Sequence, residues 1–158
     1  MTRLHPGDTA PEFALNSQNG DTIRLSDFKG SRLLLYFYPK AETPGCTVQA
    51  CSIRDSVPQL ATLGIAAVGI SPDAPDVQEQ FDQHYGLGFP LLSDTDHRVA
   101  ESYGVWGEKT AFGKTTTGII RSSFLIDENG TLMGVWYGVK PDDTVPLALE
   151  LLQESRMA

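Results

Sequence analysis

Two cysteines, Cys46 and Cys51, lie in the most chemically informative stretch of the chain. This stretch begins at Tyr38, passes through Pro39 and Thr43, and lies at the end of a continuously apolar segment. Cys46 is expected in the first turn of a helix, where unsatisfied backbone N–H groups and the positive end of the helix dipole favour thiolate over thiol. Because the thiolate is the nucleophilic form of cysteine, the pattern predicts a reactive thiol. The competing interpretation is that both cysteines are small buried hydrophobic residues.

The spacing of the two cysteines limits how their sulfurs can interact. Residues five apart on a continuous α-helix differ by about 7.5 Å of rise and about 140° of rotation, so their Cα atoms lie roughly 8–9 Å apart. A disulfide generally needs Cα atoms closer than about 7 Å. Cys46 and Cys51 can therefore bond only if the helix unwinds locally, and the spacing predicts a conformational switch. It disfavours both a C-x-x-C disulfide exchanger and a zinc site.

Length and charge limit the possible organisation and partners of the protein. The chain has 158 residues, 41% of them hydrophobic, and we expect a single domain over residues 1–158. Its formal net charge of −8 disfavours nucleic acid and anionic membranes as partners. No signal-peptide core and no run of roughly 18 apolar residues occurs in the sequence, so we expect a soluble, cytoplasmic protein.

Strand and helix signals alternate along the chain and predict an α/β sandwich. Apolar runs at 33–38 and 65–70 predict strands covered on both faces of a mixed or parallel sheet, joined by a helix at 46–62. Asn-Gly pairs predict two hairpins, one formed by 13–15 with 22–25 and one by 122–126 with 131–137. The remaining expected elements are a strand at 89–92 and helices at 75–85, near 97–103 and about 143–154. This order is typical of a thioredoxin-like sandwich, with a central mixed β-sheet flanked by helices and an N-terminal β-hairpin.

Two further patterns are weaker candidates for a site. Gly113-Lys114-Thr115 is similar to the end of a phosphate-binding loop, but Gly107 is one residue too distant and we expect no strand to lead into it. Asp94-Thr95-Asp96-His97 lacks the central glycine of a calcium loop, so we interpret it as a loop and helix cap. The sequence shows no site for a metal, flavin or haem.

Taken together, the motifs resemble those of the peroxiredoxin family. Pro39-x-x-x-Thr43-x-x-Cys46 is similar to the family signature, and the extension to Ala50-Cys51 resembles the bacterioferritin comigratory protein, or peroxiredoxin Q, subfamily. The resemblance covers nearly the full chain. Further matching motifs, in the same order, are Gly69-Ile70-Ser71, Leu91-Leu92-Ser93-Asp94, Gly104-Val105-Trp106-Gly107-Glu108-Lys109 and Arg121-x-Ser123-Phe124-Leu125-Ile126-Asp127.

The resemblance implies a thiol-dependent peroxidase that reduces hydrogen peroxide and alkyl hydroperoxides. It implies that Cys46 is the peroxidatic cysteine and that Cys51 is the resolving cysteine, which closes an intramolecular disulfide. It further implies that Thr43 supplies a hydrogen-bonding hydroxyl, that Pro39 shields the pocket, and that Arg121 is the cation beside the thiolate. The implied cycle needs no cofactor, uses thioredoxin or else glutaredoxin as the reductant, and runs in a monomer or at most a weak dimer.

Two alternatives from other functional classes stay open. One is a thiol–disulfide reductase on the same fold, against which the absence of C-x-x-C counts. The other is a peroxide-sensing module that uses Cys46 and Cys51 only as a redox switch. Peroxide turnover separates them, because a reductase acts on protein disulfides and a sensor oxidises once without rapid recycling.

Overall fold

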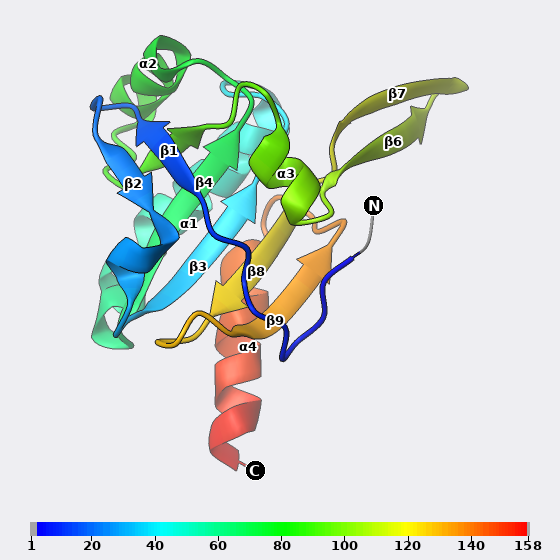
Figure 1. Cartoon of the computed structure of the whole chain (residues 1–158). Coiled ribbons are helices and arrows are strands. Elements are labelled where there is room, and N and C mark those ends of the chain that lie inside the picture. The colour runs from blue at the N-terminus through cyan, green and yellow to red at the C-terminus, as the bar shows by residue number, and fades with distance from the viewer. Residues whose placement is uncertain (1–2, 158) are drawn as a thin grey trace.

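A mixed β-sheet forms the centre of the molecule (Figure 1). The computed structural model describes residues 3–157. Three strands, β3 (Arg32–Phe37), β4 (Ile65–Ser71) and β5 (Leu91–Ser93), are parallel neighbours. Beside β3, the strands β8 (Ser122–Ile126) and β9 (Leu132–Tyr137) form an antiparallel hairpin, with β8 antiparallel to β3. The mixed central sheet and the second Asn-Gly hairpin expected from the sequence are confirmed.

The predicted N-terminal hairpin is also confirmed. Its strands are β1 (Ala14–Ser17) and β2 (Thr22–Arg24), followed by a short 3₁₀ helix, η1 (Leu25–Phe28). Gly20 has a φ of +85°, and its N–H donates to the Ser17 carbonyl at 3.0 Å, so the turn is longer than a two-residue connection. β1 pairs with β5, which gives a seven-stranded order of β2-β1-β5-β4-β3-β8-β9.

Helices cover both faces of the sheet, and β3 explains why. Leu34 and Tyr36 enter the core under α1 (Pro44–Thr62), α2 (Pro75–Tyr85) and α4 (Thr144–Met157). The alternate residues of β3 enter the opposite core, which α3 (Arg98–Ser102) helps to cover. A strand buried on both faces reads as one continuous apolar run, as the sequence does at 33–38. Within the described residues, no helix combines the length and apolar character needed to cross a membrane.

The boundaries of several elements differ from the expected ranges. α1 begins at Pro44, because proline is well suited to the first position of a helix. β5 begins at Leu91, after Pro90, which has no N–H to donate to a ladder. α3 is shorter than expected, and α4 continues beyond 154 to Met157. α2 has the predicted bounds, and Gly86 ends it in the left-handed conformation.

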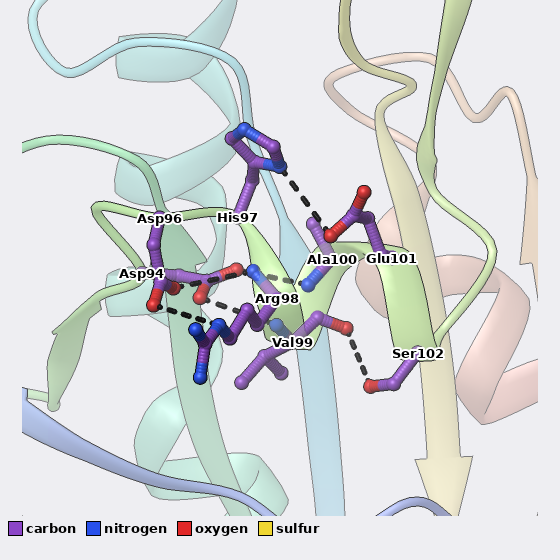
Figure 2. A network of polar contacts seen from close by, with 8 residues as sticks. All are labelled: Asp94, Asp96, His97, Arg98, Val99, Ala100, Glu101 and Ser102. Atoms are coloured by element: carbon purple, nitrogen blue, oxygen red, sulfur yellow. Dashed lines mark hydrogen bonds and ion pairs between the residues drawn. The ribbon is translucent and has the colours of Figure 1, made fainter.

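Asp94 fixes α3 at its N-terminus (Figure 2). Its carboxylate is 1% exposed and accepts hydrogen bonds from the N–H groups of Val99 (3.2 Å) and Ala100 (2.8 Å). Burial raises the pKa of Asp94, and these two backbone donors oppose the rise. The interpretation of residues 94–97 as a loop and helix cap is confirmed. The neighbouring His97 ring stacks on Trp106, with the ring centroids 3.9 Å apart.

A third hairpin projects from the body of the molecule, and it was not predicted from the sequence (Figure 1). Its strands, β6 (Trp106–Ala111) and β7 (Lys114–Ile119), pair only with each other. The expectation that no strand leads into Gly113-Lys114-Thr115 is therefore wrong, since β6 precedes the turn at Gly113. Lys114 starts a strand and not a helix, so the segment still lacks the architecture of a phosphate-binding loop. Most of β7 is exposed, so no buried apolar alternation marked it.

Close contact between β3 and β4 gives a test of packing beneath α1. Gly69 is the Cα partner of Tyr36, and a Cβ on Gly69 would lie 2.8 Å from Cζ and the hydroxyl oxygen of that fully buried ring. We expect Gly69→Ala to lower the free energy of unfolding, measured in urea, by about 1–3 kcal/mol because the ring has no space to move into. The control is Gly118→Ala, where a Cβ meets nothing within 4 Å. Equal losses in both variants would contradict this explanation.

Candidate active site

Cys46 lies in the first turn of α1, as the sequence predicts. Thr43 is the N-cap residue, Pro44 is the first helical residue, and the Thr47 N–H donates to the Thr43 carbonyl at 2.9 Å. No side-chain hydrogen bond caps this helix start. The Cys46 side chain is 1% exposed, next to backbone N–H groups that no capping side chain engages. The helix start therefore presents hydrogen-bond donors and the positive end of its dipole near the thiol.

The two cysteines lie on different faces of one continuous helix. Cys46, Gln49, Ala50 and Ile53 form its buried face at positions i, i+3, i+4 and i+7. Cys51 is half-buried, and both cysteines are free thiols. Because α1 is helical through both positions, their Cα atoms lie roughly 8–9 Å apart, too far for a disulfide. A bond between them requires unwinding of this part of the helix.

The guanidinium of Arg121 lies against the start of α1. Its Nη1 donates to Gln49 Oε1 at 2.7 Å, and a Cβ on Gly45 would lie 3.0 Å from its Nη2. Arg121 therefore extends along the helix between Gly45 and Gln49, the segment that contains Cys46. The absence of a side chain on Gly45 permits this close approach. Arg121 takes part in none of the ion pairs found among residues 3–157, so no carboxylate of that range neutralises it there.

Gln49 is a positioning residue whose role was not predicted from the sequence. It is fully buried, and its Nε2 donates to Thr144 Oγ1 at 2.9 Å while its Oε1 accepts from Arg121. One amide thus joins α1, the segment before β8 and the start of α4. The available signal was a polar residue on the otherwise apolar face of the helix, three positions after Cys46. Such a residue must find partners when it is buried.

Thr43 and Pro39 flank the loop that precedes the helix. The Thr43 hydroxyl donates to the Lys40 carbonyl at 2.8 Å and leaves its own lone pairs available to accept hydrogen bonds. Pro39 is half-buried two residues after the end of β3 and stiffens the chain there. The structure thus places Thr43, Pro39, Cys46 and Arg121 around the beginning of α1, and it places Cys51 further along that helix.

Contacts with the neighbouring β4–α2 connection hold this loop in place. The Ala41 N–H donates to Asp73 Oδ2 at 2.7 Å, and the Ser71 hydroxyl donates to the same oxygen at 2.7 Å. Glu42 has a φ of +66°, in the left-handed region that non-glycine residues rarely occupy. Local backbone strain of this kind persists only where surrounding contacts hold it. The loop is therefore fixed in one conformation before Cys46.

Two buried hydroxyls without partners among residues 3–157 lie on the sheet face that α1 covers. Tyr36 and Ser123 are partners across β3 and β8, and both hydroxyls are buried without a hydrogen-bond partner among the described residues. Burial raises the pKa of Tyr36 well above its ordinary value, and the charges of Tyr38 and Cys46 add to the rise. The phenol therefore stays neutral. In the part of the chain that the structure describes, no group of three or more His, Cys, Asp and Glu side chains is arranged to hold a metal ion.

These features define what the site can do chemically. The start of α1 brings together a buried thiol, backbone donors and the guanidinium of Arg121, which has no carboxylate partner among residues 3–157. Fixed donors of this kind stabilise negative charge that develops during attack by a thiolate on a small electrophile.

Comparisons with known proteins agree with this chemistry. A family model described as the AhpC/TSA family matches residues 6–135. A protein named putative peroxiredoxin bcp from Haemophilus influenzae is 50% identical over 153 residues, 97% of this chain and 99% of that protein. Peroxiredoxin Bcp of Escherichia coli strain K12 is 48% identical over 154 residues, 98% of this chain and 99% of its own.

Solved structures give the same result at lower sequence identity. A crystal structure of a mutant Xylella fastidiosa PrxQ superposes with a TM-score of 0.90, at 29% identity and over 99% of both chains. A structure of the Xanthomonas campestris bacterioferritin comigratory protein, described for its alkyl peroxide reduction activity, has a TM-score of 0.83 at 30% identity. It covers 90% of this chain and 91% of that one. The thioredoxin-like peroxiredoxin sandwich expected from the sequence is thereby confirmed.

The buried amide of Gln49 gives a direct test of how the site is held together. Gln49→Leu leaves the Arg121 donor and the Thr144 hydroxyl without this partner, so we expect a loss of about 1–3 kcal/mol in the free energy of unfolding in urea. The matched control is Gln83→Leu on the exposed face of α2, where we expect a change within about 0.5 kcal/mol. If the two variants lose the same stability, Gln49 does not connect the elements as described.

Proposed function

This chain belongs to the AhpC/TSA family and is a peroxiredoxin, an enzyme that reduces peroxides, and from that premise we propose how its residues perform the reaction. Cys46 is the peroxidatic nucleophile, and its substrates are hydrogen peroxide and alkyl hydroperoxides. The observation that carries this assignment is the convergence of the α1 start and the Arg121 guanidinium on a buried thiol. We take residues 1–158 to act as one domain and as a monomer.

The first step transfers one oxygen atom to sulfur. The Cys46 thiolate attacks one peroxide oxygen, so an S–O bond forms while the O–O bond breaks, and Cys46 becomes a sulfenic acid. The second oxygen leaves as hydroxide or alkoxide and takes up a proton to give water or an alcohol. Negative charge moves from sulfur to the departing oxygen during this step. Arg121 and the free N–H groups of the first helical turn stabilise that charge more in the transition state than in the ground state.

Thr43 and Pro39 orient the peroxide. The Thr43 hydroxyl already donates to the Lys40 carbonyl, so its oxygen is free to accept the proton of a bound hydroperoxide. This hydrogen bond holds the protonated peroxide oxygen, which is the one transferred to sulfur, beside Cys46. Pro39 covers the thiol from the β3 side and limits access of water. The fixed loop thereby presents the substrate in one orientation, which reduces the entropy cost of reaction.

The second step closes a disulfide between Cys46 and Cys51. The Cys51 thiol attacks the sulfenic sulfur, an S–S bond forms, and the hydroxyl leaves as water. Because the helix holds the two residues too far apart, the segment between them must unwind first. Unwinding displaces Gln49 and so breaks its bonds to Arg121 and Thr144. The reduced, helical form is therefore stabilised by the contacts that orient Arg121.

Thioredoxin recycles the disulfide in this proposal. A thioredoxin thiolate attacks one sulfur of the Cys46–Cys51 bond, and its second thiol releases the reduced enzyme. Two features support access for a protein reductant. Cys51 is half-buried and not enclosed, and Val48, between the two cysteines, is 52% exposed. Glutaredoxin is the alternative donor.

Replacement of the nucleophile tests the central assignment. We expect Cys46→Ser to reduce peroxide consumption to the rate without enzyme, because an alcohol at this position does not supply a comparable nucleophile. The measurement is stopped-flow peroxide reduction coupled to thioredoxin, with glutaredoxin compared as the donor. Cys51→Ser is the matched control, since it keeps Cys46 and should still consume the first equivalent of peroxide, which Cys46→Ser should not. Undiminished turnover in Cys46→Ser would refute the proposal, and reduction of insulin disulfides without peroxide turnover would favour the reductase.

Replacement of the second cysteine tests the resolving role. We expect Cys51→Ser to consume about one equivalent of peroxide per chain and then stop, because the sulfenic acid has no partner thiol. Mass spectrometry of the wild-type protein after one equivalent of peroxide should show an intramolecular disulfide under non-reducing conditions. Absence of that disulfide, or sustained thioredoxin-dependent turnover by Cys51→Ser, would show that Cys51 is not the resolving residue.

A further inference from the structure

Lys109 on β6 is a cation whose position the proposed mechanism leaves unexplained. Its side chain is half-buried, and it takes part in none of the ion pairs found among residues 3–157. By contrast, Lys114 on the paired strand β7 is exposed to solvent. Removing an ammonium group from water without a carboxylate partner is unfavourable. A half-buried lysine without such a partner is stabilised by any other negatively charged group near it.

The alternation of β6 shows which way Lys109 faces. Glu108 and Thr110 are exposed, whereas Gly107 and Lys109 are half-buried. A Cβ on Gly107 would lie 3.2 Å from Cδ1 of Ile120, the residue directly before Arg121. Residues two apart on a strand share a face, so Lys109 lies on the face that is turned toward this segment. The lysine thus faces the body of the molecule on the side of Arg121.

The base of the β6–β7 hairpin is fixed to the body of the molecule, so the position of Lys109 is defined. The Ile120 N–H donates to the Val105 carbonyl at 2.7 Å, and Trp106 pairs with Ile119. The Trp106 ring stacks on His97, which lies at the start of the Asp94-capped helix α3 in Figure 2. These contacts join β6 to the same chain segment that carries Arg121.

The charges around Lys109 come from two other elements of the site. Burial lowers the pKa of Lys109, and repulsion from Arg121 lowers it further, whereas the charge of Cys46 raises it. On its own strand, the neighbouring Glu108 lies on the opposite, exposed face. Arg121 itself is held by the neutral amide of Gln49. Of the two groups whose charges act on Lys109, Arg121 is a cation and the Cys46 thiol is the one that can become an anion.

We propose that Lys109 is a second cation of the peroxidatic site and that, together with Arg121, it stabilises the Cys46 thiolate from β6. This inference rests on the proposed nucleophilic role of Cys46. Lys109 acts through the electric field of its ammonium group, as a positioning residue. Its positive charge and that of Arg121 both favour the thiolate form of Cys46. The unfavourable burial of Lys109 and its repulsion by Arg121 are offset once the thiolate forms. Such local conflicts are expected at functional sites.

The test measures thiolate formation directly and does not need peroxide. In a Cys51→Ser background, Cys46 is the only thiol, so its alkylation rate by iodoacetamide against pH reports its ionisation. We expect Lys109→Met to raise the midpoint by about half to one pH unit, a roughly three- to tenfold loss of thiolate below the midpoint. Lys109→Gln should give the same shift, which should shrink in high salt.

Two matched variants separate charge from packing. Lys109→Arg keeps the charge, and Lys114→Met removes a charge from the same hairpin at an exposed position, so both should keep the parent midpoint. A parental midpoint in Lys109→Met and Lys109→Gln would overturn the inference, as would an equal shift in Lys109→Arg. Neither result affects the nucleophile assignment, because that assignment fails only if Cys46→Ser still turns over peroxide.

Discussion

The buried amide of Gln49 is the interaction on which the arrangement of the site depends. It accepts from Arg121 and donates to Thr144, so α1, the β8 approach and α4 are held by a single side chain. A buried amide is stable only when its polar atoms are paired, and losing one partner costs more than the bond itself contributes. The three elements therefore have one favoured relative position, and that position places the guanidinium beside the first turn of α1.

In the proposed cycle, the same helix is ordered for attack and opened for resolution, and its two halves differ in how they are held. Ile53 and Leu60 anchor the later turns in the core. At the beginning, no side chain caps the helix after Thr43, and Glu42 is in a strained backbone conformation. A missing N-cap generally costs a helix about 0.5–2 kcal/mol. In the proposed cycle, this cost falls on the turn that unwinds. The missing cap also leaves backbone N–H donors free for the peroxide.

The sequence predicted the parts of the fold whose signals are local. The run at 33–38 is apolar because β3 is buried on both faces, and Pro75 and Gly86 mark the ends of α2 through their backbone preferences. The position of Cys46 follows from the strand-to-helix transition in the same way. The β6–β7 hairpin gave no such signal, since most of its side chains face solvent and do not alternate between apolar and polar types.

The contacts that organise the site were not predictable because they join distant positions. Gln49 is 72 residues from Arg121 and 95 residues from Thr144. No local periodicity specifies such a pair, and a single buried glutamine on an apolar face shows only that partners must exist. Lys109 is a similar case, because its motif was visible in the sequence but its orientation toward Arg121 depends on the tertiary position of β6.

Charge connects these features to the redox cycle. The chain carries a formal net charge of −8, yet Arg121 and Lys109 take part in none of the ion pairs of residues 3–157. Arg32, Arg54 and Arg98, by contrast, pair with carboxylates elsewhere.

In the proposed cycle, the Cys46 thiolate is the negative charge that Arg121 and Lys109 stabilise, and disulfide formation removes this charge. The field that promotes attack on peroxide therefore also favours the reduced state over the disulfide, as for other oxidants whose thiolate form is stabilised. In this proposal, a reductant restores the Cys46 thiolate near Arg121 and Lys109, so the same charges support both the oxidation of Cys46 and its regeneration.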